Sequence, residues 1–365
     1  MMSISLKLFT KMFLVIIVIF TVFLYLFAIV LGPALFYFTP EGQNISLLHM
    51  QTLPVWLLIV PAYIPIGLDF GVIFFGLWSI FIFCFVAAWK VKESFHKTIK
   101  ESITKPTRKL FSSSLFALPI INSMTFIAII IIQGIQEAGG IPTGTSPIQS
   151  DPFLDFVDLS YAAVSEELGF RLIPIGAFLI IYLLVTKKKE VTFTFRQKAK
   201  LFFMSFLFPD KAKRAAGKKT VSEYGVMGGI SLGEWGIVVF TSVIFGLAHF
   251  DPGVSWEIGK VTSAGFAGLV MGLSFLAYGF QASIIIHWFF NAYTDTFFLF
   301  TEIYPAATPF ANSVIIISII LGILGWSAVA TLSSRQLVKT IQARIRKNRQ
   351  KQATPNTPIF PQLDY

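Results

Sequence analysis

Two adjacent carboxylates and an arginine stand inside a long apolar stretch of the sequence. Glu166, Glu167 and Arg171 interrupt the hydrophobic block at about 157–186. Because an ionisable group at membrane depth costs about 2.5 to 3.5 kcal/mol on insertion scales, such groups indicate a functional site by default. Glu167 and Arg171 are four residues apart and share a helix face, so they can form an ion pair that offsets the cost of burial. Glu166 points about 100° away from that face, which makes it a candidate general base for activating water.

Two histidines and an asparagine fall in later apolar blocks. His249 follows Phe245 by four residues, and Asn291 follows His287 by the same interval. Since residues i and i+4 share a helix face, the Phe245 ring is expected to form a wall beside the His249 imidazole. For the same reason His287 and Asn291 are expected to face one space. Glu, His and Asn side chains can activate water and stabilise an oxyanion, or they can hold a metal through nitrogen and oxygen atoms.

Besides a membrane-embedded enzyme, two other classes of membrane protein are compatible with the same polar groups. In a proton-coupled transporter the carboxylates would relay protons. A transporter is expected to contain internal repeats, and the polar motifs of this chain are unlike one another. In a non-catalytic immunity or scaffold protein the groups would form a structural cluster, and the intact set of Glu, His and Asn side chains argues modestly against that alternative.

The composition indicates a polytopic membrane protein. Hydrophobic residues make up 55% of the 365 residues and charged residues 13%, where soluble domains carry about 25% charged residues. Prolines and glycines break the second of the apolar blocks, so its span is expected at Phe70–Trp89, after a surface or re-entrant piece at Val55–Ile66. We therefore expect an all-α bundle of about eight transmembrane helices with the site in an intramembrane cavity. The eight apolar blocks cover residues 12–38, 53–89, 111–134, 157–186, 235–250, 261–278, 282–301 and 313–333.

The basic residues predict the orientation of the chain. They gather before residue 12 and in the segments 90–109, 187–219 and 335–365, with Arg171 as one of two exceptions. Eight spans place these four segments on one face, which the positive-inside rule makes cytoplasmic. We therefore expect a multi-pass protein of the cell membrane with both termini in the cytoplasm. The net charge of +10 is explained by contact with membrane lipids and does not indicate a nucleic-acid partner.

Three motifs, taken together and in order, resemble those of a known family. They are EExxxR at Glu166–Arg171, FxxxH at Phe245–His249 and HxxxN at His287–Asn291, each on a separate expected span. The set resembles the CPBP family, which comprises CAAX prenyl endopeptidases and related bacteriocin-processing or self-immunity membrane proteins. The resemblance covers roughly residues 155–300. It implies an intramembrane endopeptidase that cleaves a membrane-associated peptide or a prenylated protein.

The resemblance also implies roles for individual residues. Glu166 would activate the attacking water with the help of His249, while His287 and Asn291 would stabilise the oxyanion. The family is often described as metalloproteases, so a zinc ion held by Glu166, His249 and His287 stays open as an alternative. The absence of an HExxH motif from the sequence favours glutamate-activated water slightly. Supporting positions would be taken by Glu167, Arg171 and Phe245.

The expected organisation has a catalytic core between further membrane helices. The core is residues 155–300, preceded by three spans and an outer loop in 1–154 and followed by a last span in 301–334 and a basic cytoplasmic tail in 335–365. One difficulty concerns depth, because His287 starts its span from the inner side whereas the other site residues lie in the outer half. A turn at Gly279 within the membrane would bring His287 closer to mid-depth.

Overall fold

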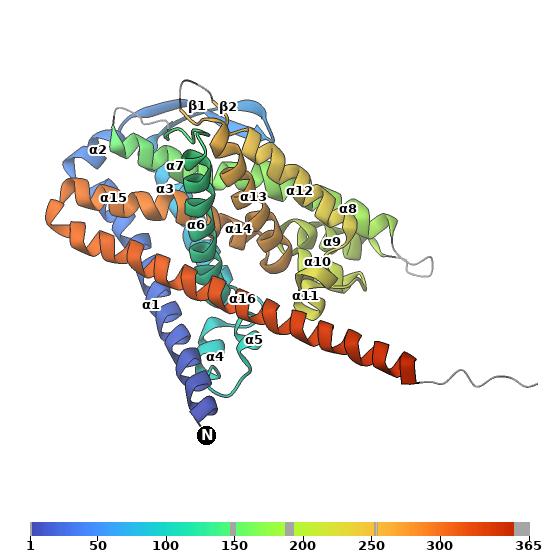
Figure 1. The fold of residues 1–365 in the computed structure, drawn as a ribbon. Helices are drawn as coiled ribbons and strands as arrows, with labels where there is room; N and C mark the ends of the chain where they lie inside the picture. The colour runs from blue at the N-terminus through green and yellow to red at the C-terminus, as the bar shows by residue number, and fades with distance from the viewer. Residues whose placement is uncertain (1, 147–150, 187–192, 252, 254, 354–365) are drawn as a thin grey trace, which may run out of the picture.

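The structure is a helical bundle with one short hairpin (Figure 1). It is a computed structural model that describes residues 2–146, 151–186, 193–251, 253 and 255–353. The model is 79% helical, and the described residues form a single two-stranded sheet. The expected all-α membrane architecture is therefore confirmed.

Sixteen α-helices and two strands are described, with two π-helical turns and one short 3-10 turn between them. The α-helices are α1 (Met2–Phe38), α2 (Pro40–Ser46), α3 (Phe70–Lys90), α4 (Phe95–Lys100), α5 (Thr107–Leu110), α6 (Ser114–Ala138), α7 (Pro152–Glu167), α8 (Ile173–Val185), α9 (Phe195–Leu207), α10 (Pro209–Ala215), α11 (Val221–Gly229), α12 (Leu232–Leu247), α13 (Ile258–Tyr278), α14 (Phe280–Trp288), α15 (Thr294–Ile303) and α16 (Thr308–Ala353). The strands are β1 (His49–Leu57) and β2 (Val60–Asp69), the π turns are Leu168–Leu172 and Phe289–Tyr293, and the 3-10 turn is Pro305–Ala307.

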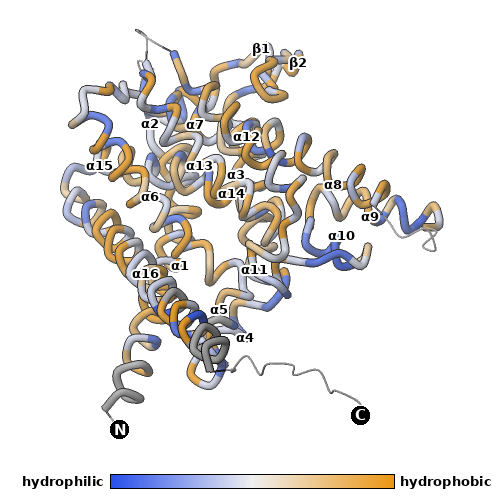
Figure 2. Tube along the Cα trace, turned by 45° about the vertical axis from the view of Figure 1, so that its right-hand side comes forward, coloured by the Kyte–Doolittle hydropathy of each residue, from blue (hydrophilic) through white to orange (hydrophobic). Residues whose placement is uncertain are grey.

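Among the described residues, six helices are long and apolar enough to cross a membrane, or seven if the bent pair α11 and α12 is one span. These two helices meet at an angle of 71°. The expected count of about eight is not reached by this measure, because the stretch 280–303, which contains the seventh expected span, is not among these helices. Apolar residues nevertheless run along most of the bundle helices, and hydrophilic residues are concentrated at α10 (Figure 2).

The apolar stretch before α3 forms an antiparallel hairpin. Strands β1 and β2 pair from His49 opposite Asp69 to Leu57 opposite Val60. The hairpin caps the end of the bundle that also carries α2 (Figure 1). The expected surface piece is thus part of a two-stranded sheet, and the span expected after it is confirmed as α3 with a difference of one residue at its end.

The loop after α6 contacts the segment that leads into α13. The Glu257 amide donates to the Thr143 carbonyl at 3.0 Å, and the Gly259 amide donates to the Pro142 carbonyl at 2.9 Å. The segment at 135–156 therefore does more than connect α6 with α7. It ties α6 to the α12–α13 loop, while residues 147–150 within it lie outside the described part of the chain.

The last helix continues without a break through the boundary expected at residue 334. Helix α16 runs for 46 residues, and its first half packs on α6, where the Trp326 indole donates to the Met124 carbonyl at 2.8 Å. Its second half projects from the bundle (Figure 1). The basic segment from 335 to 353 is thus a helical extension of the last span, and residues 354–365 lie outside the described chain.

The turn between α13 and α14 is made by one residue. Helix α13 ends at Tyr278 and α14 begins at Phe280, with Gly279 at a φ of 105° between them. A positive φ of this kind is readily adopted only by glycine. The turn expected at Gly279 is confirmed.

Helices α12 and α13 approach each other closely through glycines, as membrane helices commonly do. A Cβ atom at Gly246 would overlap the Val261 carbonyl oxygen and lie 3.1 Å from the Gly265 nitrogen. We expect Gly246→Ala to push the two helices apart and to cost about 1–3 kcal/mol of stability. The measurement is the melting temperature of the detergent-purified protein.

The same helix offers a matched control for that substitution. A Cβ atom at Gly236 meets nothing within 4 Å, so Gly236→Ala should leave the melting temperature unchanged or slightly higher, because alanine favours helix by about 1 kcal/mol. Equal melting temperatures for the two variants would contradict the close helix approach.

Candidate active site

A buried carboxylate joins an arginine and a histidine from two helices. Oε1 of Glu167 accepts from Nη1 of Arg171 at 2.8 Å and from Nδ1 of His287 at 2.9 Å. The Glu167 and Arg171 side chains are 0% exposed. The expected ion pair is therefore present, and Glu167 has a second contact, to His287, that the i, i+4 spacing does not predict.

The guanidinium of Arg171 is also held by an aromatic ring. Its central carbon lies 4.1 Å from the centroid of the Phe245 ring, a distance at which a cation is attracted by the ring face. The approach depends on Gly268 of α13, where a Cβ atom would lie 2.9 Å from Nη2 of Arg171. Side chains from the ends of α7, α12 and α14 thus meet at this point.

Glu166 differs from its neighbour in its exposure. Its side chain is 23% exposed, and its Oε2 atom lies 3.7 Å from Nε2 of His287. This distance is too long for a hydrogen bond, and among the described residues Oε2 has no hydrogen-bond partner. His287 therefore lies between two carboxylates. Glu167 is buried and hydrogen-bonded, and Glu166 is partly exposed.

His249 lies just beyond the end of α12 and is oriented by the backbone. Its Nδ1 atom is 2.8 Å from the Phe245 carbonyl oxygen, which can only accept, so Nδ1 carries the proton in that bond. The other ring nitrogen, Nε2, is then free to accept a proton. The imidazole lies 4.6 Å from the Phe245 ring, as the spacing predicted, and interacts electrostatically with Glu166.

Asn291 lies inside the π turn Phe289–Tyr293. Its Nδ2 atom donates to the Leu159 carbonyl of α7 at 3.2 Å. The amide consequently contacts α7, and its expected role at the oxyanion stays a prediction.

The comparisons with known proteins point to one family. Residues 150–293 match the family model described as type II CAAX prenyl endopeptidase Rce1-like. This range contains all three motifs. Residues 150–293 are an Rce1-like domain of the CPBP family. No curated protein and no solved structure matches the chain.

The Rce1-like domain agrees with the resemblance predicted for residues 155–300. Membership supports a CAAX-type intramembrane endopeptidase in general. The first three membrane helices and α16 lie outside the matched range.

Both π turns of the described chain stand next to site residues of the Rce1-like domain. Leu168–Leu172 begins directly after Glu167, and Phe289–Tyr293 begins two residues after His287. Such turns are rare and frequently occur at functional sites, because they redirect the side chains of one turn. The hairpin packs on the first of them, since a Cβ atom at Gly169 would overlap the Trp56 carbonyl oxygen.

The zinc alternative stays a prediction. Nδ1 of His287 is bonded to Glu167 and Nδ1 of His249 to the main chain, as is common for the second nitrogen of a metal-bound histidine, so their Nε2 atoms are the ones that could bind a metal. No group of three His, Cys, Asp or Glu side chains within the described ranges is placed to hold a metal ion. We therefore derive no catalytic step through a metal.

Lys260 is a further charged group of the Rce1-like domain that interacts with the site. Its Nζ atom lies 3.5 Å from the Trp256 ring centroid, and its charge interacts with Glu166. The sequence contained a signal for it, because Lys260 and Arg171 are the two basic residues outside the four basic segments. The sequence predicted a role only for the arginine.

Proposed function

We propose that the protein is an intramembrane endopeptidase in which Glu166 activates the water that attacks the scissile peptide bond. The observation that carries this proposal is the contrast between the two carboxylates. Glu167 is fully buried and hydrogen-bonded to both Arg171 and His287, whereas the Glu166 side chain is 23% exposed and lies 3.7 Å from His287, too far for a hydrogen bond. A general base needs a carboxylate that is not committed to such bonds and that water can reach.

Glu166 and His249 would both contact the attacking water, Glu166 as the base that takes a proton and His249 as a hydrogen-bond acceptor. The Glu166 carboxylate takes one proton as the water oxygen bonds to the carbonyl carbon, and later gives it to the leaving amine. Nε2 of His249 accepts a hydrogen bond from the same water, since its Nδ1 proton is committed to the Phe245 carbonyl. The water oxygen is thereby oriented toward the substrate.

His287 is the proposed stabiliser of the oxyanion. Glu167 accepts from its Nδ1 atom and so orients the ring, and a proton carried on Nε2 would be donated to the negative oxygen. A preorganised donor of this kind typically contributes about 10²- to 10³-fold to turnover. Asn291 is proposed as a second donor through the amide hydrogen that Leu159 does not use.

The proposed substrate is a membrane-associated peptide or a prenylated protein, which follows from the Rce1-like family rather than from the geometry. The test is incubation of the purified protein with matched peptide and prenyl-peptide libraries, with and without a chelator. Cleavage that survives the chelator supports glutamate-activated water. Cleavage lost with the chelator and restored by zinc would replace this mechanism, and the absence of all cleavage would favour a non-catalytic member.

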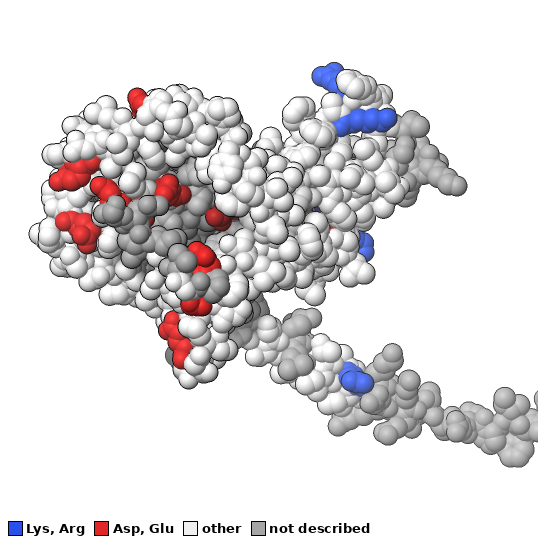
Figure 3. All heavy atoms as spheres, turned by 90° about the horizontal axis from the view of Figure 1, so that it is seen from above, with Lys and Arg blue, Asp and Glu red and all other residues white. Residues whose placement is uncertain are grey.

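The proposed orientation places the basic segments and both termini in the cytoplasm. Helices α4, α5 and α10 lie at the end of the bundle opposite the hairpin (Figure 1). Seen from the hairpin end, Asp and Glu side chains gather around a hollow in the surface (Figure 3). The positive-inside rule assigns the hairpin end to the outside.

Cysteine labelling in intact cells tests this orientation. Cys84 is the only cysteine in the sequence and is buried, so a new exposed cysteine gives a clear signal. We expect a membrane-impermeant maleimide to label Gln51→Cys in the hairpin and to spare Lys100→Cys in α4 until the cells are opened. The reverse pattern would invert the topology.

A further inference from the structure

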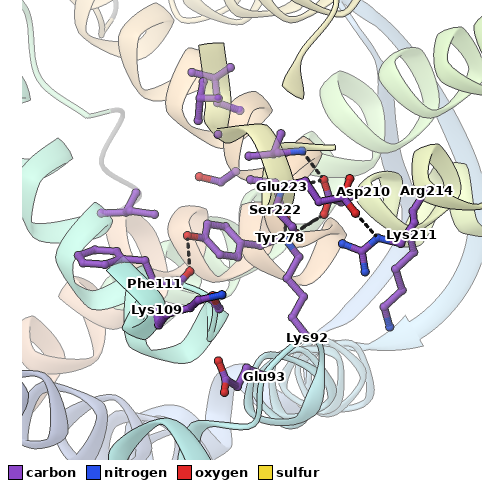
Figure 4. Close-up of a pocket in the computed structure, with 18 of the residues that line it drawn as sticks. Lys92, Glu93, Lys109, Phe111, Asp210, Lys211, Arg214, Ser222, Glu223 and Tyr278 are labelled. Carbon is purple, nitrogen blue, oxygen red and sulfur yellow. Dashed lines mark hydrogen bonds and ion pairs between the residues drawn. The ribbon is translucent and has the colours of Figure 1, made fainter. Parts of the chain in front are cut away.

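A large cavity opens among the basic helices (Figure 4), and none of the proposed catalytic residues lines it. Its volume is about 1460 Å³, and its walls come from the α3–α4 and α5–α6 connections, α6, α10, α11 and α13. Six cationic side chains line it against three anionic ones. The cations are Lys90, Lys92, Lys97, Lys109, Lys211 and Arg214, and the anions are Glu93, Asp210 and Glu223.

All three anionic side chains already have cationic partners. Asp210 lies 3.4 Å from Nζ of Lys92, and its carboxylate also accepts from the Val221 amide at 2.7 Å. Glu223 pairs with Arg214 at 3.2 Å. Glu93 pairs with Lys105, which lies outside the lining.

Four cations of the lining are left without an acidic partner among the described residues. Three of them have exposed side chains at the rim and come from three helices, α4, α5 and α10, namely Lys97, Lys109 and Lys211. The fourth is Lys90 at the end of α3. Since like charges repel one another at low screening, a cluster of unpaired cations favours an anionic ligand.

Lys92 lines the cavity and is held there by contacts with α13 and α10. It donates to the Ala277 carbonyl at the end of α13, and its Nζ atom lies 4.9 Å from the Tyr278 ring centroid. Burial lowers the pKa of the Lys92 ammonium, and the Asp210 carboxylate partly offsets that effect. The ion pair with Asp210 holds the α3–α4 connection to α10. It therefore helps to fix the relative positions of the segments that carry the rim cations.

The remaining wall of the cavity is apolar. Ile121 of α6 and Val270, Leu273 and Ala277 of α13 line it, and both helices are long and apolar enough to cross a membrane. The serine hydroxyls of Ser94 and Ser112 also border the cavity. A cationic rim above a wall of membrane helices matches a molecule with an anionic head and an apolar tail.

We propose that this cavity binds an anionic phospholipid, with its headgroup phosphate among Lys97, Lys109 and Lys211 and an acyl chain along α6 and α13. A soluble phosphate compound would use the rim alone and would leave the apolar wall exposed. The lipid comes from the leaflet on the side of the basic segments, where anionic headgroups are attracted by Lys and Arg.

Native mass spectrometry of the full chain in detergent tests the proposal. The probes are phosphatidylglycerol, which is anionic, and phosphatidylcholine, which is zwitterionic. The variant is Lys97→Gln/Lys109→Gln/Lys211→Gln, and the matched control is Lys100→Gln/Lys198→Gln/Lys200→Gln. The control removes the same charge from exposed side chains outside the lining.

We expect the wild-type protein to bind phosphatidylglycerol at least about tenfold more tightly than phosphatidylcholine, and the triple variant to lose about tenfold or more of that affinity. The control should stay within about twofold. The single variant Lys211→Gln, with a smaller loss of about fivefold, serves if the triple variant does not fold.

Three results would overturn the proposal. The first is equal binding of the two lipids, and the second is an equal loss in the control and the triple variant. In the third, millimolar glycerol phosphate or inorganic phosphate displaces the lipid completely, which would identify the cavity as a site for a soluble anion. Persistence of lipid binding in their presence supports the lipid.

Discussion

Replacing Glu166 with glutamine should reduce cleavage by roughly 10²- to 10⁴-fold, the usual contribution of a general base. The amide keeps the size of the side chain and cannot take the proton of the attacking water. Stability should change little, because Oε2 of Glu166 has no hydrogen-bond partner among the described residues. The measurement is the turnover of a cleaved library peptide, together with the melting temperature of the variant.

A control and a companion variant sharpen this result. Glu137→Gln alters an exposed carboxylate at the end of α6 and should retain full turnover. His249→Ala should lose turnover as well, since it removes the Nε2 acceptor. Wild-type turnover in both Glu166→Gln and His249→Ala would exclude the proposed mechanism.

Replacing Arg171 with methionine should have the largest effect on stability. The substitution leaves the buried Glu167 carboxylate without its cationic partner, and breaking a buried pair in this way costs about 3–5 kcal/mol. The side chain is fully buried against Phe245 and Gly268, so water cannot replace the guanidinium easily. The melting temperature in detergent should fall by many degrees.

The double variant Glu167→Met/Arg171→Met separates stability from catalysis. Replacing both members of a buried pair by apolar side chains is often neutral or stabilising, so most of the lost stability should return. Turnover should not return, because Nδ1 of His287 loses its acceptor at Glu167. A double variant with normal turnover would show that Glu167 does not position His287.

The sequence predicted those features that depend on local periodicity. The span that begins at Phe70, the Glu167–Arg171 ion pair and the turn at Gly279 all follow from apolar runs, helical spacing or the freedom of glycine. The three motifs also predicted the family. These features need no knowledge of how distant segments meet.

The remaining features depend on tertiary structure. The bond between Glu167 and His287 joins residues 120 positions apart, and no spacing within one helix reveals it. The hairpin is apolar enough to resemble a membrane piece, and its pairing became visible only with both strands in place. The bond from Asn291 to the Leu159 carbonyl likewise joins two distant segments, so the spacing alone does not reveal it.

The two π turns link the site to the rest of the bundle through helix register. Each accommodates an additional residue within a continuous helix, and one residue of α-helix corresponds to a rotation of about 100°. Deleting one residue from Leu168–Leu172 would remove this additional residue and return the turn to α-helix, with α8 close to its present register. A deletion in the α-helix on either side has no additional residue to remove, so it would turn away the face of α8 that packs on α9. Single-residue deletions should therefore disturb the packing of α8 less within the π turn than beside it.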